Sequence, residues 1–160
     1  MRPFFKSRGN ERGAALVEAA LILPIFFALV LGMITFGDAY FTRISIEDAV
    51  RDGARFGAVM ADFDEEVIRE RVAGLAGGGL AADDVCVWLV EAPDPEPNVF
   101  ERCGLGDEDD PPVVDDPGGA EPGDQIVKVF ALAEGNIEVI FWSRQIDIKA
   151  HSVAPYEAGS

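Results

Sequence analysis

The chain has 160 residues, enough for one modest domain in addition to any membrane segment. Its formal net charge at pH 7 is −16. This charge argues against a general affinity for nucleic acid or anionic lipid, because binding to phosphates needs a positive field.

Residues 1–13 form a basic leader in which Glu11 is the only acidic side chain. Four basic residues precede the apolar segment: Arg2, Lys6, Arg8 and Arg12. Positive charge next to a membrane segment stays on the cytoplasmic side. We therefore expect the N-terminus in the cytoplasm and a strongly acidic domain, residues 38–160, outside it.

Residues 14–37 are predicted to span a membrane as a helix. All are apolar or small except Glu18, Pro24 and Thr35. At about 1.5 Å per residue they make roughly 36 Å of helix, enough to cross a hydrocarbon core of about 30 Å. A signal peptide cleaved after Ala39 is the main alternative. The length of the apolar run favours a retained helix, since a signal peptide has an apolar region of about 7–15 residues.

The same helix is expected to continue outward as an amphipathic helix, because no proline lies between Met33 and Met60. Residues at steps of three and four form one apolar face: Ile46, Val50, Gly53, Gly57 and Met60. Small residues recur at every fourth position: Ala49, Gly53 and Gly57. Such a small-residue ridge allows close backbone approach, either to another subunit's helix or to a strand or helix of the same chain.

A second, short helix is predicted to follow Asp64, a suitable N-cap, with Glu65 and Glu66 in its first turn. Its apolar face is expected to comprise Ile68, Val72 and Leu75. Glycines 77–79 end the helix, and they make a turn rather than a phosphate-binding loop, since no lysine follows them.

Three strands are expected in the second half of the chain. The first is "DDVCVWLVE", whose two faces alternate: Val85, Val87 and Leu89 on one side, Cys86, Trp88 and Val90 on the other. "DQIVKVFALA" and "RQIDIKAHSV" are the other two, and "EGNIEVIFW" between them is a connector, either partly helical or an extension of a strand. The predicted fold class is α+β, with the long N-terminal helix packed against a small antiparallel sheet of about three strands.

Residues 92–123 form a loop rich in proline and acidic residues, including "GDEDDPPVVDDPGGAEPG". This composition is expected to bury too little apolar area to order the loop. The order of acids and glycine typical of an EF-hand is absent, so we interpret the segment as a solvated acidic loop and expect no metal and no cofactor.

The two cysteines, Cys86 and Cys103, both follow the membrane segment. A disulfide between them is the natural interpretation if this part of the chain is extracytoplasmic. Closing a loop of this length would stabilise the fold by about 3 kcal/mol. The alternative is a pair of unrelated buried thiols.

Catalytic motifs are missing from the sequence, so we expect no enzymatic activity. The single histidine, His151, lies on a predicted strand, and the nucleophile-elbow, zinc-protease and dinucleotide-binding patterns are absent. Carboxylates abound but cluster in the loop, where no fixed geometry would hold an acid–base pair.

The N-terminus resembles a type IV prepilin, in which a basic leader ends in glycine and a glutamate stands fifth in the apolar helix. Gly13 and Glu18 occupy these positions. More narrowly, "RGAALVEAALILPIFFALVLGMITFGDAYFTR" followed by "AVRDGARFGAV" is similar to the TadE/TadG-type pseudopilins of tight-adherence (Flp) pilus systems. The resemblance covers residues 12–59, and the C-terminal half matches only loosely.

This resemblance implies a non-catalytic pilus component of the bacterial inner membrane that a prepilin peptidase cuts between Gly13 and Ala14. Its partners would be other pilin or pseudopilin subunits. Cleavage would create an ammonium at Ala14, one helical turn from Glu18, and a carboxylate in or near a bilayer costs far less when paired with a cation. The cation would belong to the same chain or to a neighbouring subunit. The alternative is an uncleaved, signal-anchored surface domain whose acidic loop binds a cation or a protein.

Overall fold

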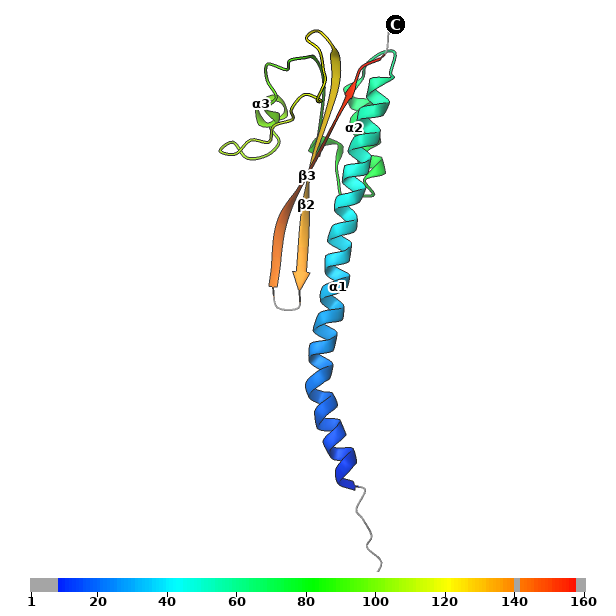
Figure 1. Ribbon diagram of the computed structural model, residues 1–160, viewed down its shortest axis with the longest axis vertical. Coiled ribbons are helices and arrows are strands. Elements are labelled where there is room, and N and C mark those ends of the chain that lie inside the picture. Colours follow the sequence, from blue (N-terminus) through cyan, green and yellow to red (C-terminus); the bar gives the residue numbers. More distant parts are fainter. Residues whose placement is uncertain (1–8, 140–141, 158–160) are drawn as a thin grey trace, which may run out of the picture.

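The computed structural model describes residues 9–139 and 142–157. One long helix, α1 (Gly9–Ala58), runs the length of the molecule, and a small α+β domain lies beside its C-terminal half (Figure 1). The predicted fold class is confirmed, and so is the continuation of the apolar helix into an amphipathic one. Pro24 lies inside α1 without ending it.

The two halves of α1 differ in what surrounds them. Large apolar side chains are exposed along its N-terminal half, from Leu16 to Phe41. From Ile46 onward, one face of the helix is buried in the domain core. Within the described ranges, one helix is long and apolar enough to cross a membrane by length and composition, and it is this helix, near the N-terminus.

Helix α2 (Glu65–Leu75) packs antiparallel to the C-terminal end of α1 (Figure 1). The predicted N-cap is confirmed: the side chain of Asp64 accepts hydrogen bonds from the backbone N–H groups of Glu66 and Val67. Ile68 and Val72 are buried as predicted, but the prediction for Leu75 is wrong, since this side chain is 50% exposed. Ala76, one position later, is buried in its place, because the buried side of α2 follows steps of four residues from Ile68 through Val72 to position 76.

The sheet is antiparallel, with strand order β1-β2-β3. After the short 3-10 helix η1 (Ala82–Asp84), β1 (Val85–Glu91) pairs with β2 (Gln125–Val139), which pairs with β3 (Trp142–Pro155). The predicted connector between the last two strands is an extension of both strands and not a helix, although its residues 140–141 lie outside the described ranges. β1 pairs with only the first part of β2, so the rest of the β2–β3 hairpin is two-stranded.

Both faces of the three-stranded part of the sheet are covered. Val85 and Val87 face α1 and α2, whereas Cys86 and Trp88 face a second cluster with Phe130, which confirms the predicted alternation along β1. The second cluster is closed by the segment between β1 and β2, which contains the short helix α3 (Val99–Cys103).

The expectation that residues 92–123 cannot order themselves is wrong. Val99 and Val114 of this segment are fully buried against the sheet. Asn98 caps α3 through its side chain and forms an isolated bridge with Val113. The loop is acidic and proline-rich, yet it is packed against the sheet because it covers apolar side chains that the strands supply.

The C-terminal end of the described chain is fastened to the end of α1. The hydroxyl of Tyr156 donates a hydrogen bond to the carbonyl oxygen of Met60 (2.9 Å), and the backbone N–H of Glu157 donates to the carbonyl of Ala58 (2.9 Å). These bonds join segments about a hundred residues apart and close the core between α1 and β3.

Gly53 provides a test of the packing between α1 and α2. A Cβ atom at this position would collide with the Cγ2 atom of Val72, whereas a Cβ at Gly74 of α2 meets nothing within 4 Å. We expect Gly53→Ala to lower the free energy of unfolding by about 1–2 kcal/mol, because overpacking outweighs the gain in helix propensity. Urea unfolding in detergent measures this loss.

Gly74→Ala is the matched control. It makes the same chemical change in the same helix pair without a clash, and it should stabilise the fold by up to about 1 kcal/mol. Equal effects of the two substitutions would contradict close packing at Gly53.

Candidate functional site

The predicted processing residues lie on the exposed N-terminal part of α1. Gly13, Ala14 and Glu18 are all exposed, and nothing lies within 4 Å of a Cβ built on Gly13. Residues 14 and 18 are one helical turn apart, on the same side of the helix. This part of the helix therefore offers its whole circumference to a membrane or to other helices.

The small-residue ridge of α1 is occupied by the same chain. Ala49 is buried, and Val72 of α2 fills the space beside Gly53. A Cβ at Gly57 would lie 2.7 Å from Cδ1 of Ile68 and 3.1 Å from Cγ1 of Val127. Of the two occupants that the sequence left open, the structure shows a helix and a strand of the same chain.

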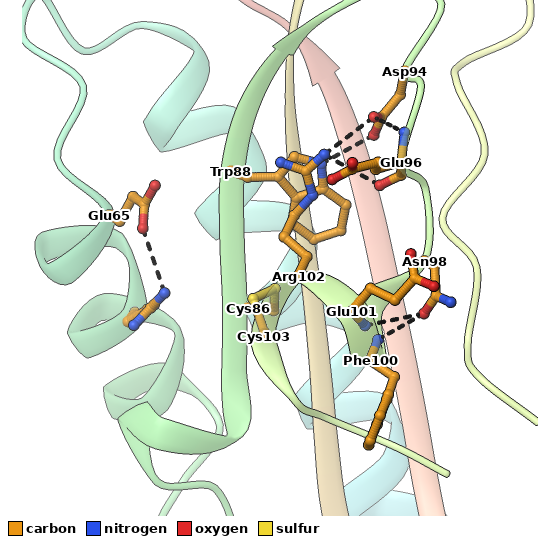
Figure 2. Close-up of a disulfide and its surroundings, with 11 residues drawn as sticks. Glu65, Cys86, Trp88, Asp94, Glu96, Asn98, Phe100, Glu101, Arg102 and Cys103 are labelled. Atoms are coloured by element: carbon orange, nitrogen blue, oxygen red, sulfur yellow. Dashed lines mark hydrogen bonds and ion pairs between the residues drawn. A yellow bond between two sulfur atoms is a disulfide. The ribbon is translucent and has the colours of Figure 1, made fainter. Parts of the chain in front are cut away.

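The two cysteines form a disulfide that attaches α3 to the sheet (Figure 2). Cys86 lies in β1 and Cys103 ends α3, with their Cα atoms 5.9 Å apart. Next to the disulfide, the guanidinium of Arg102 lies over the ring of Trp88, 5.2 Å from its centroid. The covalent bond and the cation–π contact together hold α3 against β1.

Asp94 joins this cluster to the beginning of the loop. Its carboxylate accepts hydrogen bonds from the indole N–H of Trp88 at 3.1 Å and from Nη2 of Arg102 at 3.2 Å (Figure 2). The same Nη2 atom also donates to the carbonyl of Glu96. The side chain of Asp94 is only 1% exposed, so it is a buried carboxylate with several donors.

A fully buried lysine, Lys128 of β2, lies at the centre of the cluster. Its ammonium donates a hydrogen bond to the carbonyl of Val114 at 2.6 Å. It also forms ion pairs with Asp94 (Oδ2, 3.0 Å) and Asp116 (Oδ1, 2.7 Å). Asp116 in turn accepts a hydrogen bond from the backbone N–H of Asp94. One buried cation therefore binds both ends of the loop, at positions 94 and 116.

The pKa of Asp94 is set by its burial and by the donors around it. Burial raises the pKa, but the backbone N–H of Glu96, the Trp88 indole and the Lys128 ammonium lower it by more, so the net pKa lies below the ordinary value. Asp94 therefore stays ionised at neutral pH. A charge pair in this position specifies where the loop lies, since removing one partner leaves the other charge buried and unpaired.

Sequence reasoning missed the role of Lys128, although one signal was present. The strand "IVKVFALA" is apolar on both faces except for its lysine, which is typical of a strand covered on both sides. A lysine on such a strand must find anions in whatever covers it. The covering segment is the acidic loop.

The described residues offer no assembled site for a metal ion. No group of three or more His, Cys, Asp or Glu side chains in the described ranges, which include the whole acidic loop, could hold a metal ion. His151 lies exposed on β3. Asp94 and Asp116 form ion pairs with Lys128.

An exposed apolar helix that continues into a small α+β domain with a disulfide fits a membrane-anchored component. Residues 13–55 match the family model described as TadE-like protein. This match covers less than half of the chain and confirms the resemblance to the TadE/TadG-like family for the N-terminal segment. It begins at Gly13 and ends within the buried part of α1. No curated protein and no solved structure matches the chain.

Replacing Lys128 tests whether the buried cation holds the loop. We expect Lys128→Met to lower the free energy of unfolding by about 3–5 kcal/mol, because Asp94 and Asp116 would remain buried without a counter-charge. The control is Lys149→Met on the neighbouring strand, where the lysine is exposed and the change should be within about 0.5 kcal/mol. A small effect at Lys128 would show that the loop does not depend on this ion pair.

The lowered pKa of Asp94 predicts how stability responds to acid. Ionised Asp94 stabilises the fold at a pH above its unfolded value of about 3.9, and this contribution disappears as the pH falls through the lower folded value. The difference in unfolding free energy between the native chain and Asp94→Asn should be constant down to about pH 5 and shrink below about pH 4.

Urea titrations at a series of pH values measure this difference. Asp110→Asn, at an exposed position of the same loop, is the control and should show little difference at any pH. A gap for Asp94→Asn that persists unchanged into strong acid would contradict the assigned role of its carboxylate.

Proposed function

We propose that the chain is a non-catalytic pseudopilin or minor pilin-like component of a tight-adherence (Flp) pilus assembly system. Residues 14–37 would hold it in the bacterial inner membrane as a single span. The observation that carries this proposal is the TadE-like match over residues 13–55, which begins at the expected processing glycine and follows α1 into the domain core.

In the proposed orientation, residues 1–13 face the cytoplasm and residues 38–160 lie outside it. The basic leader supports this, because positive charge stays on the cytoplasmic side of a span. The disulfide between Cys86 and Cys103 also supports it, since disulfides persist in oxidising compartments outside the cytoplasm.

The proposed processing step is a cut by prepilin peptidase between Gly13 and Ala14. It would leave an ammonium at Ala14, one turn from the carboxylate of Glu18. Both positions are exposed on α1, so the ammonium that pairs with Glu18 can come from the same chain or from a neighbouring subunit. Pairing across subunits would fix the register of adjacent helices, because an unpaired carboxylate near the bilayer is costly.

Association with other pilin or pseudopilin subunits is proposed to use the exposed face of α1 and not the small-residue ridge. The ridge is supported as an internal packing surface, since Val72, Ile68 and Val127 fill it. The free apolar surface of α1 lies in its N-terminal half, where large side chains such as Leu16, Leu21 and Phe26 are exposed.

Intact-mass measurement of the chain purified from cells that contain prepilin peptidase tests the processing step. We expect the loss of residues 1–13. Full-length protein would instead support the uncleaved, signal-anchored surface domain, and loss of residues 1–39 would support a secreted protein. Either result would overturn the proposal.

Glu18→Ala tests the assembly role of the carboxylate. We expect recovery with other pilin subunits to fall by at least roughly tenfold, which corresponds to about 1.4 kcal/mol of association free energy. Asp48→Ala is the control, because it removes an exposed α1 carboxylate that forms a surface ion pair with Arg51. Unchanged recovery for Glu18→Ala, measured by co-purification, would remove Glu18 from the assembly mechanism.

A further inference from the structure

The charge cluster formed by Lys128, Asp94 and Asp116 brings a primary amine against two carboxylates inside the domain. The side chain of Lys128 is fully buried and that of Asp94 is 1% exposed. Nζ of Lys128 lies 2.7 Å from Oδ1 of Asp116 and 3.0 Å from Oδ2 of Asp94. An amine and a carboxylate held this closely, with a second carboxylate in reach, have the groups that are needed to form an amide bond.

The two oxygens of Asp116 have different surroundings. Its Oδ2 accepts a hydrogen bond from the backbone N–H of Asp94 at 3.1 Å. Its Oδ1 is buried and accepts no hydrogen bond from the described residues, although Nζ of Lys128 is the neighbouring amine. A fixed donor at one oxygen stabilises the negative charge that develops there when a nucleophile adds to the carboxyl carbon. The other oxygen is the one that can leave.

Asp94 is placed to carry protons between these groups. A proton carrier must lie within hydrogen-bond reach of the proton that it takes, and Oδ2 of Asp94 lies 3.0 Å from Nζ of Lys128. Asp94 is ionised at neutral pH, as its lowered pKa indicates, so it is able to accept a proton. The Trp88 indole and Arg102 donate hydrogen bonds to the same carboxylate and fix its position (Figure 2).

Burial favours an amide over an ion pair at this site. In water, hydration of the separate ammonium and carboxylate stabilises them, but a buried ion pair has lost that hydration. An amide carries no net charge, so its burial costs less as long as its polar atoms have partners. Those partners are present: the carbonyl of Val114 lies 2.6 Å from Nζ, and the N–H of Asp94 faces Oδ2 of Asp116.

We propose that Lys128 and Asp116 form an isopeptide bond, an amide between Nζ of the lysine and Cγ of the aspartate. Nζ adds to Cγ while Oδ2 stays on the backbone N–H of Asp94, and the bond between Cγ and Oδ1 breaks. The ammonium gives up two protons, which leave with Oδ1 as one molecule of water. Asp94 passes these protons from Nζ to Oδ1 and ends as a carboxylate. No oxidant, reductant or further reactant is consumed.

The bond attaches the acidic loop to the sheet at a second point. The disulfide already joins Cys103, in the first half of the loop, to β1. The amide joins Asp116, in the second half, to Lys128 of β2. The ion pair described above is the arrangement from which the bond forms. Once formed, the covalent link holds the loop even when the fold is denatured, and it goes beyond the proposed function because it needs neither membrane nor partner.

Digestion of the full chain with trypsin, after denaturation and reduction, tests the proposal. Trypsin cuts after a free lysine and not after an acylated one. Lys128 is the only basic residue between Arg102 and Arg144. We expect a single peptide, residues 103–144, lighter than its sequence by the mass of one water molecule. Without the bond, two peptides of full mass result, residues 103–128 and 129–144.

Asp116→Ala and Asp115→Ala form a matched pair. Asp116→Ala removes the acyl group and should give the two peptides of full mass, whereas Asp115, which is exposed, should be replaceable without losing the bond. Asp116 precedes Pro117, which has no backbone N–H. It therefore cannot lose water by cyclising onto the following residue, so a lighter peptide that depends on Asp116 reports the bond to lysine.

Asp94→Asn and Arg102→Gln separate proton transfer from packing. Asp94→Asn keeps the size of the side chain but cannot take up a proton, so the two peptides of full mass should predominate. Arg102→Gln weakens the same cluster and leaves the carboxylate of Asp94 in place, so the bond should still form. Loss of the bond in both variants, or in neither, would overturn the role of Asp94.

Two peptides of full mass from the native chain would overturn the isopeptide bond. A lighter peptide that persists in Asp116→Ala would overturn Asp116 as the partner of Lys128. These results are independent of the proposed function, because processing and membrane anchoring are measured on residues 1–37.

Discussion

The structure depends on one constraint: the two halves of a single uninterrupted helix, α1, lie in different environments. The N-terminal half of α1 exposes large apolar side chains, and its C-terminal half buries one face in the domain core. No break separates the two halves of α1. The orientation of the N-terminal half about the helix axis therefore fixes the side on which the domain lies. The small residues of the buried face allow α2 and β2 to approach closely, and the sheet follows from there.

The buried charges determine where the acidic loop, residues 92–123, lies on the sheet. Lys128 binds Asp94 and Asp116, and the disulfide fastens α3 beside them. The loop is thereby held on the face of the sheet opposite α1, as Figure 1 shows. Its negative charge stays away from the helix, whose exposed face remains free for a membrane or for neighbouring helices. In the proposed function, the charge cluster keeps the assembly surface clear without taking part in it.

Local patterns in the sequence predicted most of the architecture. Apolar residues at steps of three and four predicted α1 and α2, and the alternation of side chains between two faces predicted β1. Asp64 predicted a helix start that the structure confirms. The points that the sequence predicted wrongly or left open have a common physical cause. Whether Leu75 is buried, what fills the space beside Gly53, and whether the acidic loop is ordered all depend on partners distant in the sequence. The composition of the loop indicates how little apolar area it can bury. It does not reveal that a buried lysine of another segment pairs with two of its carboxylates.

The proposal that α1 carries the folded domain across the membrane is tested most directly by labelling at the C-terminal end. Glu157 is exposed and lies next to the end of the buried part of α1. A cysteine at this position, Glu157→Cys, would be the only free thiol among the described residues, since Cys86 and Cys103 are paired. A membrane-impermeant maleimide should label it in intact spheroplasts. Labelling only after lysis would place the domain in the cytoplasm and contradict the proposal.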